Sequence, residues 1–191
     1  MKKIAVTGGI ASGKSVVCEI IEKLGYTVIY TDKINSELLT DLEYQKKLAL
    51  IFPSAVKNGI VDKKYIRNEI LQDDSKRLAL NTLAHSEIKA RVLNLLNKVD
   101  AKAIFVEIPL IVESGMKDCF DQIWCVVADL DTKIKRIEKR DNVSSIDAQK
   151  IIQCQKKDNE LISLSDIVIE NNGDLNKLKE EVGRLICTAI K

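Results

Sequence analysis

The stretch Gly8-Gly9-Ile10-Ala11-Ser12-Gly13-Lys14-Ser15 fits the pattern G-x-x-x-x-G-K-[S/T] at every fixed position. It stands between a β-prone run, Lys3–Thr7, and apolar residues that recur at helical spacing from Val16 to Leu24. Glycines in such a loop let the backbone curl so that successive N–H groups point at phosphate oxygens, and the start of the following helix adds the positive end of its dipole. The stretch therefore predicts a nucleoside-triphosphate site.

Two side chains of this loop have defined chemistry. Lys14 is expected to reach the β- and γ-phosphates, and the Ser15 hydroxyl is expected to ligate Mg²⁺. A glycine-rich loop can also merely join a strand to a helix. Against that alternative, the helix has a capping glycine at Gly25 and a second β-prone run follows at Thr27–Tyr30, which completes a βαβ unit.

The rest of the chain predicts one α/β domain over residues 1–191, a P-loop NTPase core with a parallel sheet flanked by helices. Further strands are expected at Ala103–Ile108, Gln122–Val127 and Ile167–Glu170. Residues 33–98 lack strand signals and carry helical patterns at Ile34–Leu39, Tyr44–Ile51, Tyr65–Leu71 and Leu78–Leu96, which indicates a helical insertion. A basic helix, Asp131–Arg140, a helical stretch around Ile146–Lys157 and a last helix, Leu175–Ile190, complete the chain. We expect the core at 1–32, 99–130 and 162–191, the insertion at 33–98 and a small helical lid at 131–161.

Composition narrows the class of protein. The 191 residues are 46% hydrophobic and carry a net charge of +2, so we expect a globular protein that does not bind nucleic acid. Five cysteines without a C-x-x-C pair and a single histidine argue against a zinc site and fit a reducing compartment. No apolar run has the length of a secretory or membrane-spanning segment. A soluble, cytoplasmic protein with no membrane partner and no obligate protein partner is expected.

P-loop proteins include GTPases and small-molecule kinases. Asn97-Lys98-Val99-Asp100 matches the guanine signature N-K-x-D, but it ends a helical pattern and precedes a strand, whereas a base-reading N-K-x-D follows a strand. None of the eight glycines belongs to a D-x-x-G sequence. A kinase is therefore favoured over a GTPase switch.

A kinase needs a group that accepts the proton of the substrate hydroxyl and cations that neutralise the transferred phosphoryl group. Asp32 follows the second strand, at the sheet edge where ligands bind, although it could equally be the N-cap of a helix beginning near Ile34. The basic helix carries Lys133, Lys135, Arg136, Lys139 and Arg140. Such a cluster is usually a solvated face; beside a P-loop it becomes a candidate lid.

Six segments together resemble the dephospho-CoA kinase family over nearly the whole chain: TGGIASGKS, LGYTVIYTDKI, LAHSEI, EIPLIVESG, KRIEKRD and DIVIENNG. The resemblance implies transfer of the γ-phosphoryl group of ATP to the ribose 3′-hydroxyl of dephospho-CoA, which gives CoA and ADP. Mg²⁺ would bridge β- and γ-oxygens, held by Ser15 and by a further acid or waters. Another nucleotide or nucleoside kinase, or a nucleotide-binding module without transfer chemistry, is the alternative.

The resemblance also assigns residues. Lys14, Asp32 and Arg140 would be catalytic, with Asp32 beside the 3′-hydroxyl. His85 would join Asp32 on the acceptor side, within a substrate-binding region at 33–98, although a lone histidine is more often structural. The implied ATP-binding residues are Gly8, Gly9, Ile10, Ala11, Ser12, Gly13, Lys14, Ser15, Val16, the lid arginines Arg136 and Arg140, and Asn172 and Gly173 of the adenine-side loop 171–173.

The sequence departs from the family pattern at three places. Tyr30-Thr31-Asp32 stands where the family often has D-A-D, and His85-Ser86 stands where it has H-P. After Gln155, Asp158 and Leu161 occupy positions where the family often shows arginines. These departures concern substrate affinity and the lid rather than the reaction.

Overall fold

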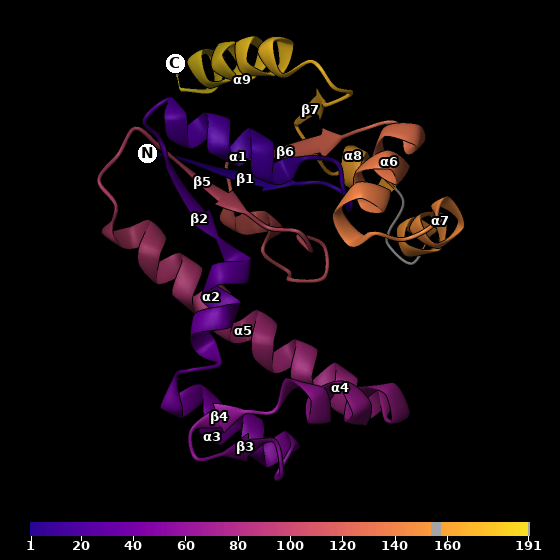
Figure 1. Cartoon of the computed structure of the whole chain (residues 1–191). Coiled ribbons are helices and arrows are strands. Elements are labelled where there is room, and N and C mark those ends of the chain that lie inside the picture. The colour runs from indigo at the N-terminus through magenta and orange to yellow at the C-terminus, as the bar shows by residue number, and fades with distance from the viewer. Residues whose placement is uncertain (154–157, 191) are drawn as a thin grey trace. The chain divides into compact units, whose positions relative to one another are not determined.

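The larger of two sheets has five strands in the order β2-β5-β1-β6-β7 in the structure, a computed structural model that describes residues 1–153 and 158–190 (Figure 1). The strands are β1 (Lys2–Thr7), β2 (Thr27–Tyr30), β5 (Ala103–Glu107), β6 (Gln122–Val127) and β7 (Ile167–Glu170). The pairs β1–β5, β1–β6 and β6–β7 are parallel. The predicted α/β core is confirmed.

The middle of the sheet is buried because its central strands carry runs of apolar residues. All five residues of β5 are buried, and Ile4, Ala5 and Val6 of β1 are fully buried. Aromatic rings of Phe105 and Trp124 meet edge to face at 5.3 Å across this core. These well-packed strands thus hold the loops that follow their carboxyl ends in fixed positions.

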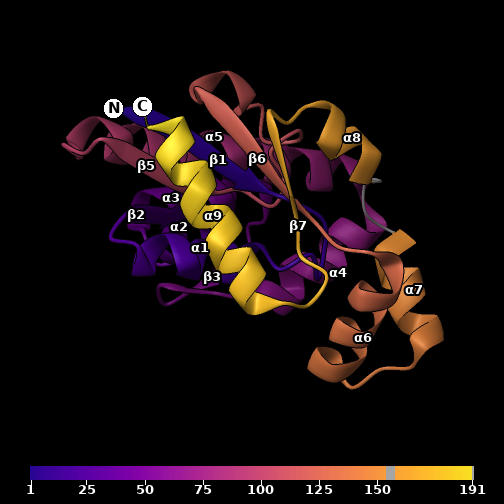
Figure 2. The same cartoon turned by 90° about the horizontal axis from the view of Figure 1, so that it is seen from above.

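Two helices cover the sheet on one side, as Figure 2 shows from above. Helix α1 (Lys14–Lys23) packs over β1 and β5, and α9 (Leu175–Ala189) packs over β7 and against α1. The end of α1 is a Schellman turn: the Gly25 N–H donates to Glu22 O at 2.9 Å and the Tyr26 N–H to Ile21 O at 3.2 Å. Gly25 adopts φ 89°, so the expected glycine cap is confirmed one residue beyond the C-cap Leu24.

The remaining helices of this part follow β5 and β6. They are η1 (Lys117–Cys119), α6 (Leu130–Asp141), α7 (Ser145–Gln153) and α8 (Asp158–Ser163). The expected helix over Ile146–Lys157 is thus observed as α7; its last part, Gln155 included, lies outside the described residues. Asp158 and Leu161 belong to a separate helix.

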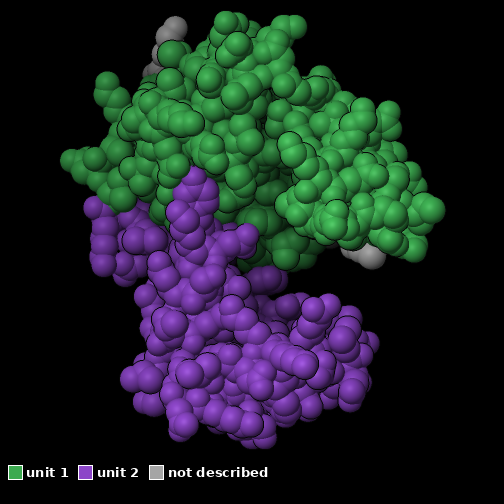
Figure 3. Space-filling model, in the orientation of Figure 1, with its two compact units in different colours: residues 1–29, 99–191 green, residues 30–98 purple. Residues whose placement is uncertain are grey.

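The chain divides into two compact units, coloured in Figure 3. Unit 1 holds residues 1–29 and 99–191, and unit 2 holds residues 30–98, where the sequence analysis set the helical region at 33–98. In unit 2 the long helix α5 (Asp74–Lys98) contacts α2 (Thr31–Leu38), α3 (Leu42–Ile51) and α4 (Lys63–Gln72). Ion pairs join α3 and its N-cap to α5: Lys47 with Glu87 and Asp41 with Arg91.

Two expectations for unit 2 are wrong. Strands do occur there: β3 (Val56–Lys57) and β4 (Ile60–Val61) form an antiparallel hairpin around Asn58-Gly59, whose φ values are 51° and 75°. An Asn-Gly pair of this kind is the hairpin signal that the apolar periodicity did not reveal.

The second error concerns Asp32. Helix α2 begins at Thr31 rather than near Ile34, and its N-cap is Tyr30. Asp32 therefore lies inside the first turn of α2 and is not its N-cap. An acidic residue in the first turn still interacts favourably with the helix dipole.

Candidate functional site

The phosphate-binding loop joins β1 to α1 at the carboxyl edge of the sheet, and its glycines are required by close contacts. A Cβ atom on Gly8 would lie 2.2 Å from Val126 O, and one on Gly13 would lie 1.9 Å from Asn171 Nδ2. Gly13, the N-cap of α1, also has φ 95°, which side chains of L residues rarely adopt. The neighbouring strands thus hold the loop so tightly that only glycine fits at these two positions.

Lys14 folds over the loop that precedes it. Its Nζ donates to Gly8 O at 2.8 Å and to Gly9 O at 3.2 Å, so the ammonium group lies above the curled backbone. Ser15 is exposed on the first turn of α1. The structure therefore places the expected phosphate cation and the expected metal ligand side by side at the helix N-terminus.

Ser12 adds a polar group that has no partner among the described residues. Its hydroxyl is buried, and neither it nor the Thr7 hydroxyl makes a hydrogen bond there. Buried polar atoms normally find a partner, and exceptions call for an explanation such as a ligand. A phosphate-binding loop gives such an explanation for Ser12.

Arg136 on α6 clamps the loop from outside. It donates through Nη1 to Ala11 O at 3.0 Å and to Ser12 O at 3.1 Å, and through Nη2 to Asn171 O at 2.9 Å and Asn171 Oδ1 at 3.2 Å. The Asn171 amide completes the clamp by donating to Ser12 O at 3.0 Å. These bonds fix α6 and the end of β7 to the loop backbone.

Apolar contacts reinforce this clamp. Ile134 and Ile137 of α6 form a buried cluster with Ala148 of α7, and the tip of the loop, Ile10 and Ala11, packs against it. Helix α6 itself begins at the N-cap Asp129, whose carboxylate accepts from Thr132 N at 2.7 Å. This hydrogen bond from the Thr132 backbone holds the pKa of Asp129 below its usual range.

A pocket of about 390 Å³ opens beside the loop between α1, α6 and the start of α9. Its lining combines apolar and cationic groups and is formed by Ala11, Gly13, Val16, Arg136, Arg140, Asn171, Gly173 and Leu175. Such a volume is in the usual range for small-molecule sites. Unit 1 thus brings together the loop, both expected arginines and Gly173; Leu175 was missed because a leucine at a helix start carries no chemical signal.

The two arginines differ in their partners. Arg140 is exposed and makes a double hydrogen bond to its neighbour Asp141, from Nε to Oδ1 and from Nη2 to Oδ2, each at 2.7 Å. This contact raises the pKa of Arg140 and lowers that of Asp141. Asn172 does not line the pocket: its Oδ1 accepts from Asp129 N at 2.9 Å, which ties the loop after β7 to the loop after β6.

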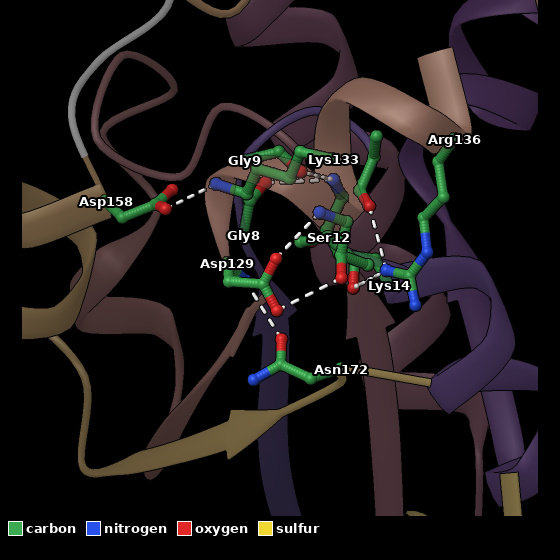
Figure 4. A network of polar contacts seen from close by, with 11 residues as sticks. Gly8, Gly9, Ser12, Lys14, Asp129, Lys133, Arg136, Asp158 and Asn172 are labelled. Carbon is green, nitrogen blue, oxygen red and sulfur yellow. Dashed lines mark hydrogen bonds and ion pairs between the residues drawn. The ribbon is translucent and has the colours of Figure 1, made fainter. Parts of the chain in front are cut away.

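A buried ion pair lies on the other side of the loop. Lys133 of α6 donates to Asp158 of α8, and Figure 4 shows the two side chains pointing toward each other beside Gly9. Both charges, and that of Lys14, affect the pKa of the Cys125 thiol of β6. Burial and the Asp158 carboxylate raise this pKa to about 11, whereas Lys133 and Lys14 lower it. The three charged groups therefore share one small region beneath the loop.

Glu107 is a buried carboxylate that the sequence analysis missed. It ends β5, pairs in register with Val6 just before the loop, and is 8% exposed. Both Glu107 and Lys14 act on the pKa of the buried Cys18, which burial raises, so their charges lie within reach of the same thiol. An acidic residue that ends a run of buried strand residues beside a P-loop strand was the available signal.

Asp32 and His85 belong to unit 2. Asp32 is exposed in the first turn of α2, and His85 is half-buried in the middle of α5. Asn97–Asp100 lies where α5 ends and precedes β5, which confirms that it is a helix end rather than a base-reading loop. Among the described residues no helix is long and apolar enough to cross a membrane, and no group of three or more His, Cys, Asp or Glu side chains could hold a metal ion.

Comparison with known proteins identifies close relatives. A family model described as dephospho-CoA kinase matches residues 2–177. The chain is 33% identical to a dephospho-CoA kinase of Fusobacterium nucleatum over 95% of both chains, and 34% identical to one of Legionella pneumophila over 95% of this chain and 92% of that protein. The solved structure of dephospho-CoA kinase from Campylobacter jejuni has a TM-score of 0.73 and 27% identity, over 97% of this chain and 95% of that chain.

Proposed function

The chain belongs to the dephospho-CoA kinase family, and we propose that the loop Gly8–Ser15 holds the phosphates of ATP while the enzyme phosphorylates the ribose 3′-hydroxyl of dephospho-CoA. The products are CoA and ADP, in the last step of coenzyme A synthesis. The match of the family model over residues 2–177 carries this conclusion, because it includes the loop, α6 and β7. Neither alternative kept open by the sequence, another nucleotide kinase or a non-catalytic module, has such support.

The loop would bind phosphate mainly through its backbone. Successive N–H groups and the N-terminus of α1 supply a fixed positive field, and Ser12 adds a buried hydroxyl that lacks a partner among the described residues. Lys14 would exchange the carbonyls of Gly8 and Gly9 for oxygens of the β- and γ-phosphates. This exchange puts the lysine charge on the group that is transferred.

Magnesium fits the oxygen donors at this place. Mg²⁺ binds through few protein oxygens and keeps several waters, and the exposed Ser15 hydroxyl and the Glu107 carboxylate are donors of that kind. We propose Ser15 as one ligand and Glu107 as the acid that holds the metal, directly or through water. When bound, Mg²⁺ would neutralise charge on the β- and γ-phosphates.

The pocket beside the loop would receive the nucleoside of ATP. Val16 and Leu175 supply apolar walls, and Gly173 leaves room for a flat ring. Arg140 would turn from Asp141 toward the phosphates, since it is exposed and lines this pocket. Arg136 would act on ATP by holding the loop in shape, and Asn172 by fixing the loop after β7.

The acceptor would be handled by unit 2. Asp32 lies two residues after the end of β2, in the first turn of α2, and its exposed carboxylate would accept or orient the proton of the 3′-hydroxyl. His85 would contact the acceptor as a hydrogen-bonding group. We further propose a cytoplasmic location and only small-molecule partners, which suits the free cysteines Cys18, Cys119, Cys125 and Cys187.

A panel of acceptors tests the proposal. The enzyme is incubated with ATP·Mg²⁺ and, separately, dephospho-CoA, AMP, dTMP and nucleosides, and ADP release is followed in a coupled assay. We expect rapid turnover with dephospho-CoA and little with the others. Preferred turnover of AMP or dTMP would overturn the acceptor, and ADP release independent of any acceptor would overturn the kinase assignment.

A further inference from the structure

The ion pair between Lys133 and Asp158 lies directly beside the phosphate-binding loop. A Cβ atom on Gly9 would lie 2.8 Å from Asp158 Oδ1 and 3.3 Å from Lys133 Nζ. Gly9 is also the residue whose carbonyl accepts from Lys14 Nζ. Two ammonium groups and one carboxylate thus meet at a single residue of the loop.

Burial makes this pair unusual. The side chain of Lys133 is 5% exposed and that of Asp158 is 30% exposed. Lysine is almost never buried without a counter-charge, and a buried ion pair contributes little to stability compared with an apolar pair of the same size. Helix α6 is already anchored by Arg136 and by its apolar face, so the pair is not required for docking the helix.

The charge of Lys133 suits a phosphate better than a carboxylate alone. A lysine ammonium is a compact point charge that binds phosphate oxygens, and the loop beside it is built to hold several of them. Without nucleotide, Asp158 neutralises Lys133. With ATP in the loop, the same carboxylate would lie next to the negative phosphates and repel them.

We propose that Lys133 is a phosphate-binding residue of the ATP site and that Asp158 is its counter-ion in the nucleotide-free enzyme. The inference rests on the proposed function, because it requires that the loop Gly8–Ser15 holds the ATP phosphates. Binding of ATP then transfers the partnership of Lys133 from Asp158 to a phosphate oxygen. Asp158 opposes ATP binding, whereas Lys133 supports it.

Because Lys133 supports ATP binding and Asp158 opposes it, substitutions at the two residues should change the dissociation constant for ATP in opposite directions. In Lys133→Met the dissociation constant for ATP·Mg²⁺, measured by titration calorimetry, should rise about 10- to 100-fold, because a charged hydrogen bond to phosphate is lost. Lys133→Arg keeps the charge and should stay within about threefold of the wild type. In Asp158→Asn the dissociation constant for ATP·Mg²⁺ should fall about three- to tenfold. The variant removes the repulsion between the carboxylate and the phosphates, and it leaves Lys133 free to bind phosphate.

Stability supplies a second readout. Asp158→Asn leaves the buried Lys133 charge without its carboxylate, so the melting temperature without nucleotide should fall. The rise in melting temperature on adding saturating ATP should exceed that of the wild type, because binding restores a counter-charge. Lys135→Met, an exposed lysine on the same helix, and Asp118→Asn, an exposed aspartate on η1, are the matched controls and should change neither measurement.

The outcomes separate the two proposals. If Lys133→Met binds ATP as tightly as Lys135→Met, or if Lys133→Met and Asp158→Asn both weaken binding, the pair is only a tether between α6 and α8 and the inference is overturned. Lys14→Ala in the same titration tests the site itself. A Lys14→Ala enzyme that binds ATP normally would overturn the proposed function instead.

Discussion

The phosphate-binding loop and helix α6 both line the pocket beside α1, but they are built in opposite ways. The loop, residues 8–15, is packed closely along its backbone, and neighbouring atoms leave no room for a side chain at Gly8 or Gly13. Helix α6 presents long cationic side chains, and three of them have different partners: Lys133 has Asp158, Arg136 has the loop carbonyls, and Arg140 has Asp141. Cationic side chains on one helix therefore differ in their contacts, and we infer their separate roles from those contacts.

The largest expected effect lies outside both regions, at Asp32. Asp32→Asn should lower kcat by about 10²- to 10⁴-fold, because a positioned acid–base group is lost with little change in shape. The melting temperature should fall only slightly, since the first turn of α2 loses a favourable charge but no cap. A folded Asp32→Asn variant with full turnover would exclude Asp32 as the group that acts on the 3′-hydroxyl.

Within the loop, Lys14 should show the largest loss. Lys14→Ala should lower kcat by about 10²- to 10³-fold, because one charge that stabilises the transferred phosphoryl group is removed. The fold should survive, since Lys14 Nζ donates to the carbonyls of Gly8 and Gly9 within its own loop. Initial rates with dephospho-CoA and a thermal melt decide this; a rate near the wild type would place the transfer elsewhere.

The two arginines of α6 sharpen the comparison. Arg140→Ala should lower kcat about tenfold or more while the KM for the acceptor and the melting temperature change little, because the side chain is exposed and its cation is needed most in the transition state.

Arg136→Ala should mainly lower the stability of the fold, in contrast to Arg140→Ala. It removes four hydrogen bonds that hold the loop to α6 and Asn171, at a cost of about 2–3 kcal/mol in the free energy of unfolding. For a chain of this length the melting temperature should fall by roughly 5–10 °C. If Arg140→Ala is the destabilised variant and Arg136→Ala is not, the roles drawn from the partners are wrong.

The smallest expected effect concerns the cysteine beneath the loop. Burial and Asp158 raise the pKa of Cys125 from 9.0 to about 11, so the group stays a neutral thiol at pH 8 and only the thiolate reacts. In the folded protein at pH 8, iodoacetamide should label the exposed Cys187 and leave Cys125 unmodified, as peptide mass spectrometry would show. Rapid labelling of Cys125 would mean that the region under Gly9 is open to solvent.

Sequence patterns predicted the loop and the sheet well because their signals are local. The fixed positions of the P-loop and the apolar runs of the strands are contiguous, and the borders of β2, β6 and β7 were predicted to the residue. The hairpin at Val56–Val61 was missed because its strands are too short for a periodic signal, although Asn58-Gly59 marked the turn. The start of α2 was set too late because Asp32 resembles a cap in sequence.

The partners of the site residues could not be predicted in this way. Arg136 and Asn171 are 35 positions apart, and Lys133 and Asp158 are 25 positions apart, so nothing in a local pattern joins them. Glu107 lies within the predicted strand Ala103–Ile108, and only its register beside Val6 places its carboxylate near the loop. The sequence thus indicated which residues are charged near the site, whereas the fold determined which of those charges are already satisfied.

The position of phosphate transfer tests the central claim most directly. Dephospho-CoA analogues that lack either the ribose 2′-hydroxyl or the ribose 3′-hydroxyl are incubated with the wild-type enzyme and ATP·Mg²⁺, and the products are analysed by mass spectrometry. We predict that the 2′-deoxy analogue gains one phosphate and that the 3′-deoxy analogue gains none, while dephospho-CoA itself is converted to CoA. Phosphorylation of the 3′-deoxy analogue, or failure to convert dephospho-CoA, would contradict the account.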